Sequence, residues 1–315
     1  MPPSTRIPPL LQPYVHVARD DSFLILTSTV GASANWLLLR FLCDTLSNTA
    51  RQGGGGGEGE GEEERNVVLV SWMREYDFWK QEARKGVGLD LERLRREGRL
   101  AFVHGLGTGL DASVQQSHAT DDRPARSAQT PHHYTLHTLE LAHVQDTISA
   151  AVAALAATSS AASTPPRKTL LILDNPDLLL ALNPTITPAS FTSLVLGLHT
   201  LPTMAHVLMH MQADNPLLSL STPAQPLELA HHNLIVKYAH MSTRILGVRV
   251  LDTGVARDVS GVIRITEHKA QGIRLRLDRE AHVEGGESGN GKEFLYQVKG
   301  DGSVRVFERG AGGEG

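Results

Sequence analysis

Residues 23–41 read FLILTSTVGASANWLLLRF and contain three successive patterns. The first four residues are apolar and predict a buried strand, and the last six predict an apolar helix. Small residues lie between them, where Gly31 permits a tight turn because glycine adopts backbone angles that other residues avoid. A strand, a short loop and a helix in this order form the framework of a phosphate-binding P-loop. The stretch therefore predicts an α/β domain of this general type.

The chemistry of a P-loop is missing from this stretch. In an alignment with G-x-x-x-x-G-K-[ST], Ser28 and Ser33 take the glycine positions, Ala34 the lysine position and Asn35 the hydroxyl position. A P-loop lysine contacts the nucleotide phosphates, and the hydroxyl binds Mg²⁺. Because both are replaced, the sequence predicts a degenerate site with a structural or binding role.

The composition allows a large core and excludes some classes of protein. The chain has 315 residues, of which 41% are hydrophobic, enough for one large α/β domain or two small ones. The net charge of -4 gives no general attraction to nucleic acid. Cys43 is the only cysteine, so no disulfide can form within the chain, as is typical of a reducing compartment.

The sequence carries no evident targeting or membrane signal. Its first residues lack the apolar core of a secretory signal. No run approaches the roughly 18 apolar residues that a membrane span needs. We therefore expect a soluble protein of the cytoplasm, and also of the nucleus, with no membrane contact.

Short apolar runs alternate with helical patterns along the chain. We expect strands at 23–27, 67–71, 100–103, 170–173, 205–211, 245–251 and 262–266. We expect helices at 33–46, 76–85, 139–157, 188–199 and 227–240. This alternation predicts a doubly wound, mostly parallel sheet with helices on both faces, and an antiparallel hairpin formed by the last two strands at one edge.

Low-complexity segments divide the chain. We expect an N-terminal extension at 1–20, a main domain at 21–280, an insert at 281–292, a β-hairpin at 293–307 and a disordered tail at 308–315. Further flexible inserts are expected at about 51–65, 109–131, 158–167 and 213–226. The hairpin is predicted by alternating residues on either side of Asp301-Gly302. The sequence leaves open whether this hairpin joins the main sheet or binds a partner.

One carboxylate ends an apolar strand pattern. Asp174 follows Leu170-Leu171-Ile172-Leu173, as in a Walker B strand whose aspartate holds Mg²⁺. An aspartate at the end of a strand also commonly caps the next turn. Because the preceding loop lacks its lysine and hydroxyl, the capping role is the favoured interpretation.

Aromatic residues gather after the second strand pattern. Trp72, Tyr76 and Trp79 are spaced to lie near one face of a helix, which predicts core packing or a subunit interface. Glu75 and Asp77 stand where some P-loop enzymes keep a catalytic carboxylate. Packing or an interface is the favoured interpretation, because a general base here would need a bound nucleotide.

Basic residues gather before the third strand pattern. Arg93, Arg95, Arg96 and Arg99 are the candidates for a positive patch that contacts nucleic acid, since arginines bind phosphates through charge-assisted hydrogen bonds. A solvated helix face is the simpler alternative.

Two other motifs are weak. The glycines at 105–109 follow a strand pattern but open no helix, so a dinucleotide site is not favoured. The histidine pairs at 132–133, 206 with 210, and 231–232 have no spacing typical of a metal site, and no metal is expected.

Several segments together resemble one family. The most distinctive is Val67-Val68-Leu69-Val70-Ser71-Trp72 with Arg74-Glu75-Tyr76-Asp77-Phe78-Trp79. The others are GLDL at 88–91, RLAFVHGL at 99–106, LILDNPD at 171–177, FLY at 294–296 and VRVF at 304–307. In this order they resemble subunit 6 of the eukaryotic Elongator complex, in a fungal form given the inserts.

The resemblance implies a RecA-like fold without a P-loop signature. It also implies a ring of six subunits formed with Elongator subunits 4 and 5, two copies of each subunit, alongside the rest of the complex. That ring binds tRNA and supports modification of the wobble uridine at C5, while the carbon chemistry belongs to another subunit. The resemblance implies neither a cofactor nor catalytic residues for this chain.

Two other functions remain open from the sequence. An active NTPase with an atypical loop would turn over nucleotide as an isolated chain, and a change at Asp174 would abolish that activity. An oxidoreductase of the Rossmann type would bind nicotinamide or flavin, but the chain lacks the glycine pattern and the ribose-binding acid of that fold.

Overall fold

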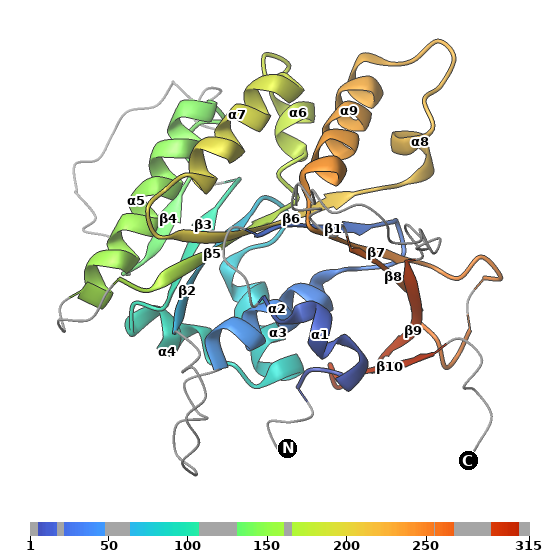
Figure 1. Cartoon of the computed structure of the whole chain (residues 1–315), viewed down its shortest axis with the longest axis horizontal. Helices are drawn as coiled ribbons and strands as arrows, with labels where there is room; N and C mark the ends of the chain where they lie inside the picture. The colour runs from blue at the N-terminus through green and yellow to red at the C-terminus, as the bar shows by residue number, and fades with distance from the viewer. Residues whose placement is uncertain are drawn as a thin grey trace, which may run out of the picture.

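The computed structural model describes residues 6–17, 22–47, 64–106, 131–160, 166–254, 256–267 and 291–308. One sheet joins these parts, with its strands in the order β10-β9-β8-β7-β1-β6-β5-β2-β3-β4 (Figure 1). The strands are β1 Ser22–Ser28, β2 Arg65–Ser71, β3 Leu100–His104, β4 His133–Thr135, β5 Lys168–Asp174, β6 Met204–Gln212, β7 Arg244–Arg249, β8 Gly261–Glu267, β9 Lys292–Val298 and β10 Val304–Glu308.

The strands from β7 to β4 in this order are parallel, and β8, β9 and β10 extend the sheet in antiparallel fashion. The predicted doubly wound, mostly parallel sheet is therefore confirmed. The strand β6 separates β1 from β5, which is the RecA-like order. In a Rossmann sheet, β1 and β2 would be neighbours, so the order argues against the oxidoreductase alternative.

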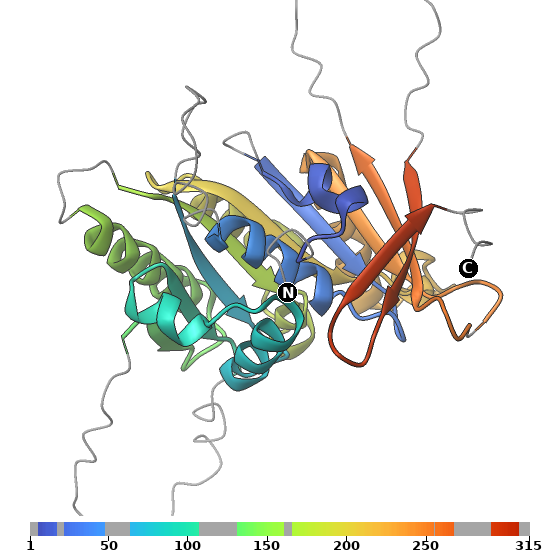
Figure 2. The same ribbon diagram turned by 90° about the horizontal axis from the view of Figure 1, so that it is seen from below.

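Helices cover both faces of the sheet (Figures 1 and 2). One layer contains α2 and α3 with shorter segments around them, and the other contains α5, α6, α7 and α9. The helical segments are η2 Pro9–Leu11, α1 Gln12–Val15, α2 Asn35–Ser47, α3 Tyr76–Val87, α4 Leu91–Arg96, α5 Leu141–Ser160, α6 Leu178–Leu182, α7 Pro188–His199, α8 Asn215–Leu218 and α9 Pro226–Met241. No helix of the described ranges combines the length and the apolar character needed to cross a bilayer.

Most expected elements lie within a few residues of their predicted bounds. The sequence did not predict the short elements α4 and β4. The helix α4 is a short basic segment capped by Asp90, whose carboxylate accepts from the Arg93 N–H, and β4 has three residues. The late strands β7 and β8 pair in antiparallel fashion as expected, but they do not form the edge of the sheet, because β9 and β10 extend it beyond β8. The terminal hairpin of β9 and β10 joins the main sheet through β8, which decides between the two alternatives left open by the sequence.

The chain ends contribute to the fold differently from expectation. Within the expected extension at 1–20, η2 and α1 place Leu11, Tyr14 and Val15 in the core. The expected insert at 213–226 contains the short helix α8. The other expected inserts at 51–65, 109–131, 158–167 and 281–292, and the tail at 308–315, fall wholly or largely outside the described residues.

Candidate functional site at the ends of β1, β5 and β6

A cavity of about 500 Å³ lies where β1, β5 and β6 end, at the first turn of α2. Its wall is the loop from β1 to α2, which contains Ser28, Gly31, Ser33, Ala34 and Asn35, and all five residues line it. The sequence therefore identified one continuous wall of this cavity. The volume is within the range of small-molecule sites.

The loop has the backbone of a tight turn but few groups that could hold a nucleotide. Gly31 has φ of +87°, and a side chain there would meet Val250 Cγ1 at 3.1 Å, so glycine is required. Ala34, at the lysine position, is buried, and the Asn35 N–H donates to Ser33 Oγ at 3.3 Å. The cation lining this cavity is Arg74, which comes from the segment after β2.

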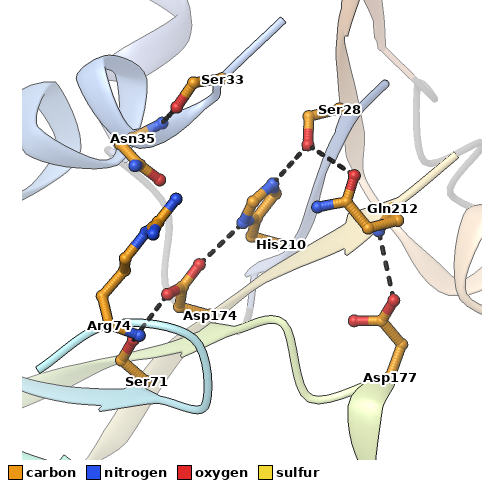
Figure 3. Close-up of polar contacts among 9 residues, drawn as sticks. All are labelled: Ser28, Ser33, Asn35, Ser71, Arg74, Asp174, Asp177, His210 and Gln212. Carbon is orange, nitrogen blue, oxygen red and sulfur yellow. Dashed lines mark hydrogen bonds and ion pairs between the residues drawn. The ribbon is translucent and has the colours of Figure 1, made fainter. Parts of the chain in front are cut away.

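A chain of buried hydrogen bonds crosses the strand ends behind this wall (Figure 3). Ser71 Oγ donates to Asp174 Oδ2 at 2.7 Å, and Asp174 Oδ1 lies 2.8 Å from His210 Nδ1. His210 Nε2 lies 2.8 Å from Ser28 Oγ, which is also 3.3 Å from Gln212 Oε1. The single Ser28 proton serves either His210 or Gln212, depending on whether Nε2 of His210 carries a proton.

Asp174 has no free side toward the cavity. It is completely buried, one oxygen faces Ser71 and the other faces His210. His210 thus stands on the side of Asp174 that faces β1, between the carboxylate and the loop (Figure 3). Asp174 ends β5 as a Walker B aspartate would, but here it binds protein groups in place of a metal shell. The described residues hold no group of three or more metal-binding side chains.

A serine hydrolase triad has the same residue types as Ser28, His210 and Asp174. The arrangement here differs, because its serine is not presented as a nucleophile. Only 3% of Ser28 is exposed, whereas a nucleophilic serine presents its oxygen to a bound substrate. The Ser28 hydroxyl is also shared with Gln212. The arrangement satisfies buried polar groups at the strand ends.

A second cluster of buried polar residues lies beside this chain of hydrogen bonds. Asp177 Oδ2 accepts from the Gln212 N–H at 3.3 Å and lies 3.8 Å from His231 Nδ1 on α9. The other His231 nitrogen lies 2.8 Å from the Gln212 carbonyl oxygen. Burial raises the pKa of Asp177, an effect that the nearby His231 opposes. These contacts connect the start of α6 to β6 and α9.

The sequence did not single out Gln212, Asp177 or His231 as site residues, and it treated His210 as an ordinary histidine. The available signal was the strand β6, MAHVLMHMQ, in which polar residues interrupt a strand with both faces covered. Such residues must find partners in the interior, as His210 does with Asp174.

The predicted aromatic interface needs correction. Trp72, Tyr76 and Trp79 are buried in the chain's own core, with Trp79 completely inaccessible. Trp72 packs with one side of the sheet, and Tyr76 and Trp79 pack with the other. The packing alternative therefore describes these residues, none of which is more than 8% exposed.

The predicted basic patch also needs correction, because its four arginines do not share one surface. Arg95 and Arg99 are buried, and Arg99 Nη1 donates to the Leu46 carbonyl at 3.1 Å. Burial lowers the pKa of Arg99. Arg93 is exposed and pairs with Glu97 at 2.6 Å, which leaves Arg96 as the exposed arginine of this group without an acidic partner among the described residues.

Comparisons with known proteins identify the family. The family described as Elongation complex protein 6 matches residues 62–283, well over half of the chain. Among solved structures, a KaiC-like protein from the archaeon Pyrococcus horikoshii OT3 is 12% identical with a TM-score of 0.47, over 91% of this chain and 90% of that chain. No curated protein sequence matches the chain significantly. The family match spans β2 to β8 and includes Asp174 and His210, and the chain belongs to the Elongation complex protein 6 family of Elongator accessory subunits.

Proposed function

We propose that this chain is a non-catalytic subunit of the Elongator accessory ring. In this proposal it assembles with Elongator subunits 4 and 5, two copies of each, into a ring of six. The ring binds tRNA and supports C5 modification of the wobble uridine by the catalytic part of the complex. Membership of the family supports a place in the Elongator complex.

The observation that carries the non-catalytic role is the state of Asp174. This carboxylate is completely buried, and Ser71 and His210 bind its two oxygens. An NTPase needs a carboxylate at this strand end for the metal shell and a loop lysine for the phosphates. Here Ala34 takes the position of the loop lysine and Asn35 takes the position of the hydroxyl, and both residues line the cavity. These features support the inference that the chain is a pseudo-ATPase.

Native mass spectrometry of this chain, co-expressed with subunits 4 and 5 of the same organism, tests the assembly. A species with two copies of each subunit is expected. A free monomer beside the other two subunits would overturn the ring. Binding of tRNA to subunits 4 and 5, measured in the presence and in the absence of this chain, tests the second part of the proposal, and equal affinities in both cases would contradict it.

The competing function is an atypical NTPase. Nucleotide turnover by the purified isolated chain, abolished by Asp174→Asn, would establish that function and overturn the proposal. We expect no turnover above that of the Asp174→Asn variant.

A further inference from the structure

A second cavity lies apart from the first at the same edge of the sheet. It has a volume of about 440 Å³ and shares no lining residue with the cavity beside β1. We call it the α3–α4 pocket, and its lining includes Glu75, Asp77, Glu92, Arg95 and His133. These residues come from the start of α3, from α4 and from β4.

The base of the α3–α4 pocket already holds one arginine. Arg95 is 4% exposed, and its Nη2 donates to Glu92 Oε1 at 2.6 Å. Its guanidinium lies 4.6 Å from the centre of the Tyr76 ring, and its Nη1 lies 3.0 Å from His133 Nδ1. A carboxylate binds a guanidinium through charge-assisted hydrogen bonds, and an aromatic face attracts it through a cation–π interaction. The pocket walls therefore have the chemistry that binds arginine.

The charges of the pocket are not balanced. Glu92 is neutralised by Arg95 and by Lys80, whose Nζ lies 3.9 Å from Glu92 Oε2. Glu75 and Asp77 are exposed and have no ion-pair partner among the described residues. The negative charge that remains at the mouth of the pocket attracts a cation and repels a phosphate backbone.

Aromatic rings also line the pocket. His104 on β3 and His133 on β4 are half-buried, and each lies against Phe102, with ring centres 6.4 Å and 5.5 Å away. Burial, and secondarily Arg95, lowers the pKa of His133, so its ring is favoured in the neutral form. A neutral imidazole offers a flat face on which a planar guanidinium can stack.

We propose that the α3–α4 pocket receives an arginine side chain from a neighbouring protein chain of the complex. The guanidinium would pair with Glu75 and Asp77 and stack on the histidine side of the pocket. Arginine suits this place better than lysine, because its planar fork matches two carboxylates and a ring face together. Arginines inserted into pockets are common anchors of protein interfaces. This inference rests on the proposed assembly with partner subunits, but it does not depend on tRNA binding.

Photo-crosslinking in the assembled complex tests the identity of the occupant. Lys80 lines the pocket and is replaced by p-benzoylphenylalanine in the full chain, co-expressed with its partner subunits. We expect a crosslink to a protein segment that contains an arginine next to the crosslinked position. A crosslink to RNA only, or no crosslink in the assembled complex, would overturn the proposal.

Neutralising the two free carboxylates tests their role. The variant Glu75→Gln/Asp77→Asn keeps side-chain size at exposed positions, so its fold should be unchanged in a thermal melt. Its affinity for the crosslinked partner should fall by about tenfold or more. The control is Glu82→Gln, on the same helix but outside the pocket lining, and should bind as wild type. Equal affinities of the two variants would refute the pocket as a charged contact.

Discussion

Asp174 and His210 are direct partners in the register of the parallel strands β5 and β6, and Oδ1 of the first lies 2.8 Å from Nδ1 of the second. Ser71 is the register partner of Asp174 on β2, so with Ser28 on β1 the chain of hydrogen bonds crosses four neighbouring strands. The strand order places β6 between β1 and β5. As a result, His210 lies between the carboxylate of Asp174 and the hydroxyl of Ser28, at the end of β1.

Breaking the Asp174–His210 contact should destabilise the fold. Asp174→Ala leaves His210 Nδ1 and the Ser71 hydroxyl buried without an acceptor, and we expect a loss of about 3 kcal/mol in the free energy of unfolding. Urea unfolding of the purified chain measures this value. Asp252→Asn is the control, because that carboxylate is 78% exposed and should change stability by less than about 0.5 kcal/mol. Similar losses in both variants would show that the buried contact contributes no more to the free energy of unfolding than an exposed carboxylate does.

The raised pKa of Asp177 predicts a dependence of stability on pH. The folded chain binds the Asp177 proton more tightly than the unfolded chain does, whose carboxyl has the ordinary value of 3.8. The contribution of this group to stability is therefore present at low pH and is lost as the pH rises from about 3.8 through the folded pKa.

Replacing this group should remove that dependence. Asp177→Asn keeps an oxygen that can accept from the Gln212 N–H but does not titrate. The stability of the variant relative to wild type should therefore increase as the pH is raised from 4 to 7. Unfolding by urea at several pH values measures the difference. A constant difference across this range would mean that Asp177 has the same pKa in both states.

The loop before α2 should not tolerate a side chain at Gly31. Gly31→Ala imposes a positive φ on alanine and brings Cβ to 3.1 Å from Val250 Cγ1. We expect a loss of about 1–2 kcal/mol in the free energy of unfolding. Gly300→Ala is the matched control, because no atom lies within 4 Å of the added carbon, and its effect should be small. Thermal unfolding of the two variants in one buffer makes the comparison.

Local sequence patterns predicted the strands that form the centre of the sheet. Unbroken apolar runs such as those in β1 and β5 are buried, as is typical of parallel strands that are covered on both faces of a sheet. The loop residues from Ser28 to Asn35 were likewise located from sequence, because a strand, a small-residue turn and a helix follow each other directly in the chain.

The partners of these residues could not be predicted in the same way. His210 meets Asp174 across 36 positions of sequence, and the contact exists because β5 and β6 are neighbours in a particular register. The arginine prediction failed for a related reason. The charge of Arg95 and Arg99 suggested exposure to solvent, but both side chains are buried. The Arg95 guanidinium lies over the Tyr76 ring, and the Arg99 guanidinium donates to the Leu46 carbonyl. Tertiary packing decided both outcomes.

The burial of Trp79 allows a test of whether the aromatic residues at 72–79 serve core packing or a subunit interface. Trp79 is a residue of α3 and is completely inaccessible in the core, so Trp79→Ala should cost about 3–5 kcal/mol in the free energy of unfolding of the isolated chain. Met73→Ala, at a side chain with 49% exposure in the same segment, should leave stability within about 0.5 kcal/mol of wild type. Urea unfolding of the isolated chain, with no partner present, gives both values. If Trp79→Ala were as stable as wild type alone but failed to enter the complex, the segment would be an interface after all, and the burial of Trp79 would belong to a conformation that the partner replaces.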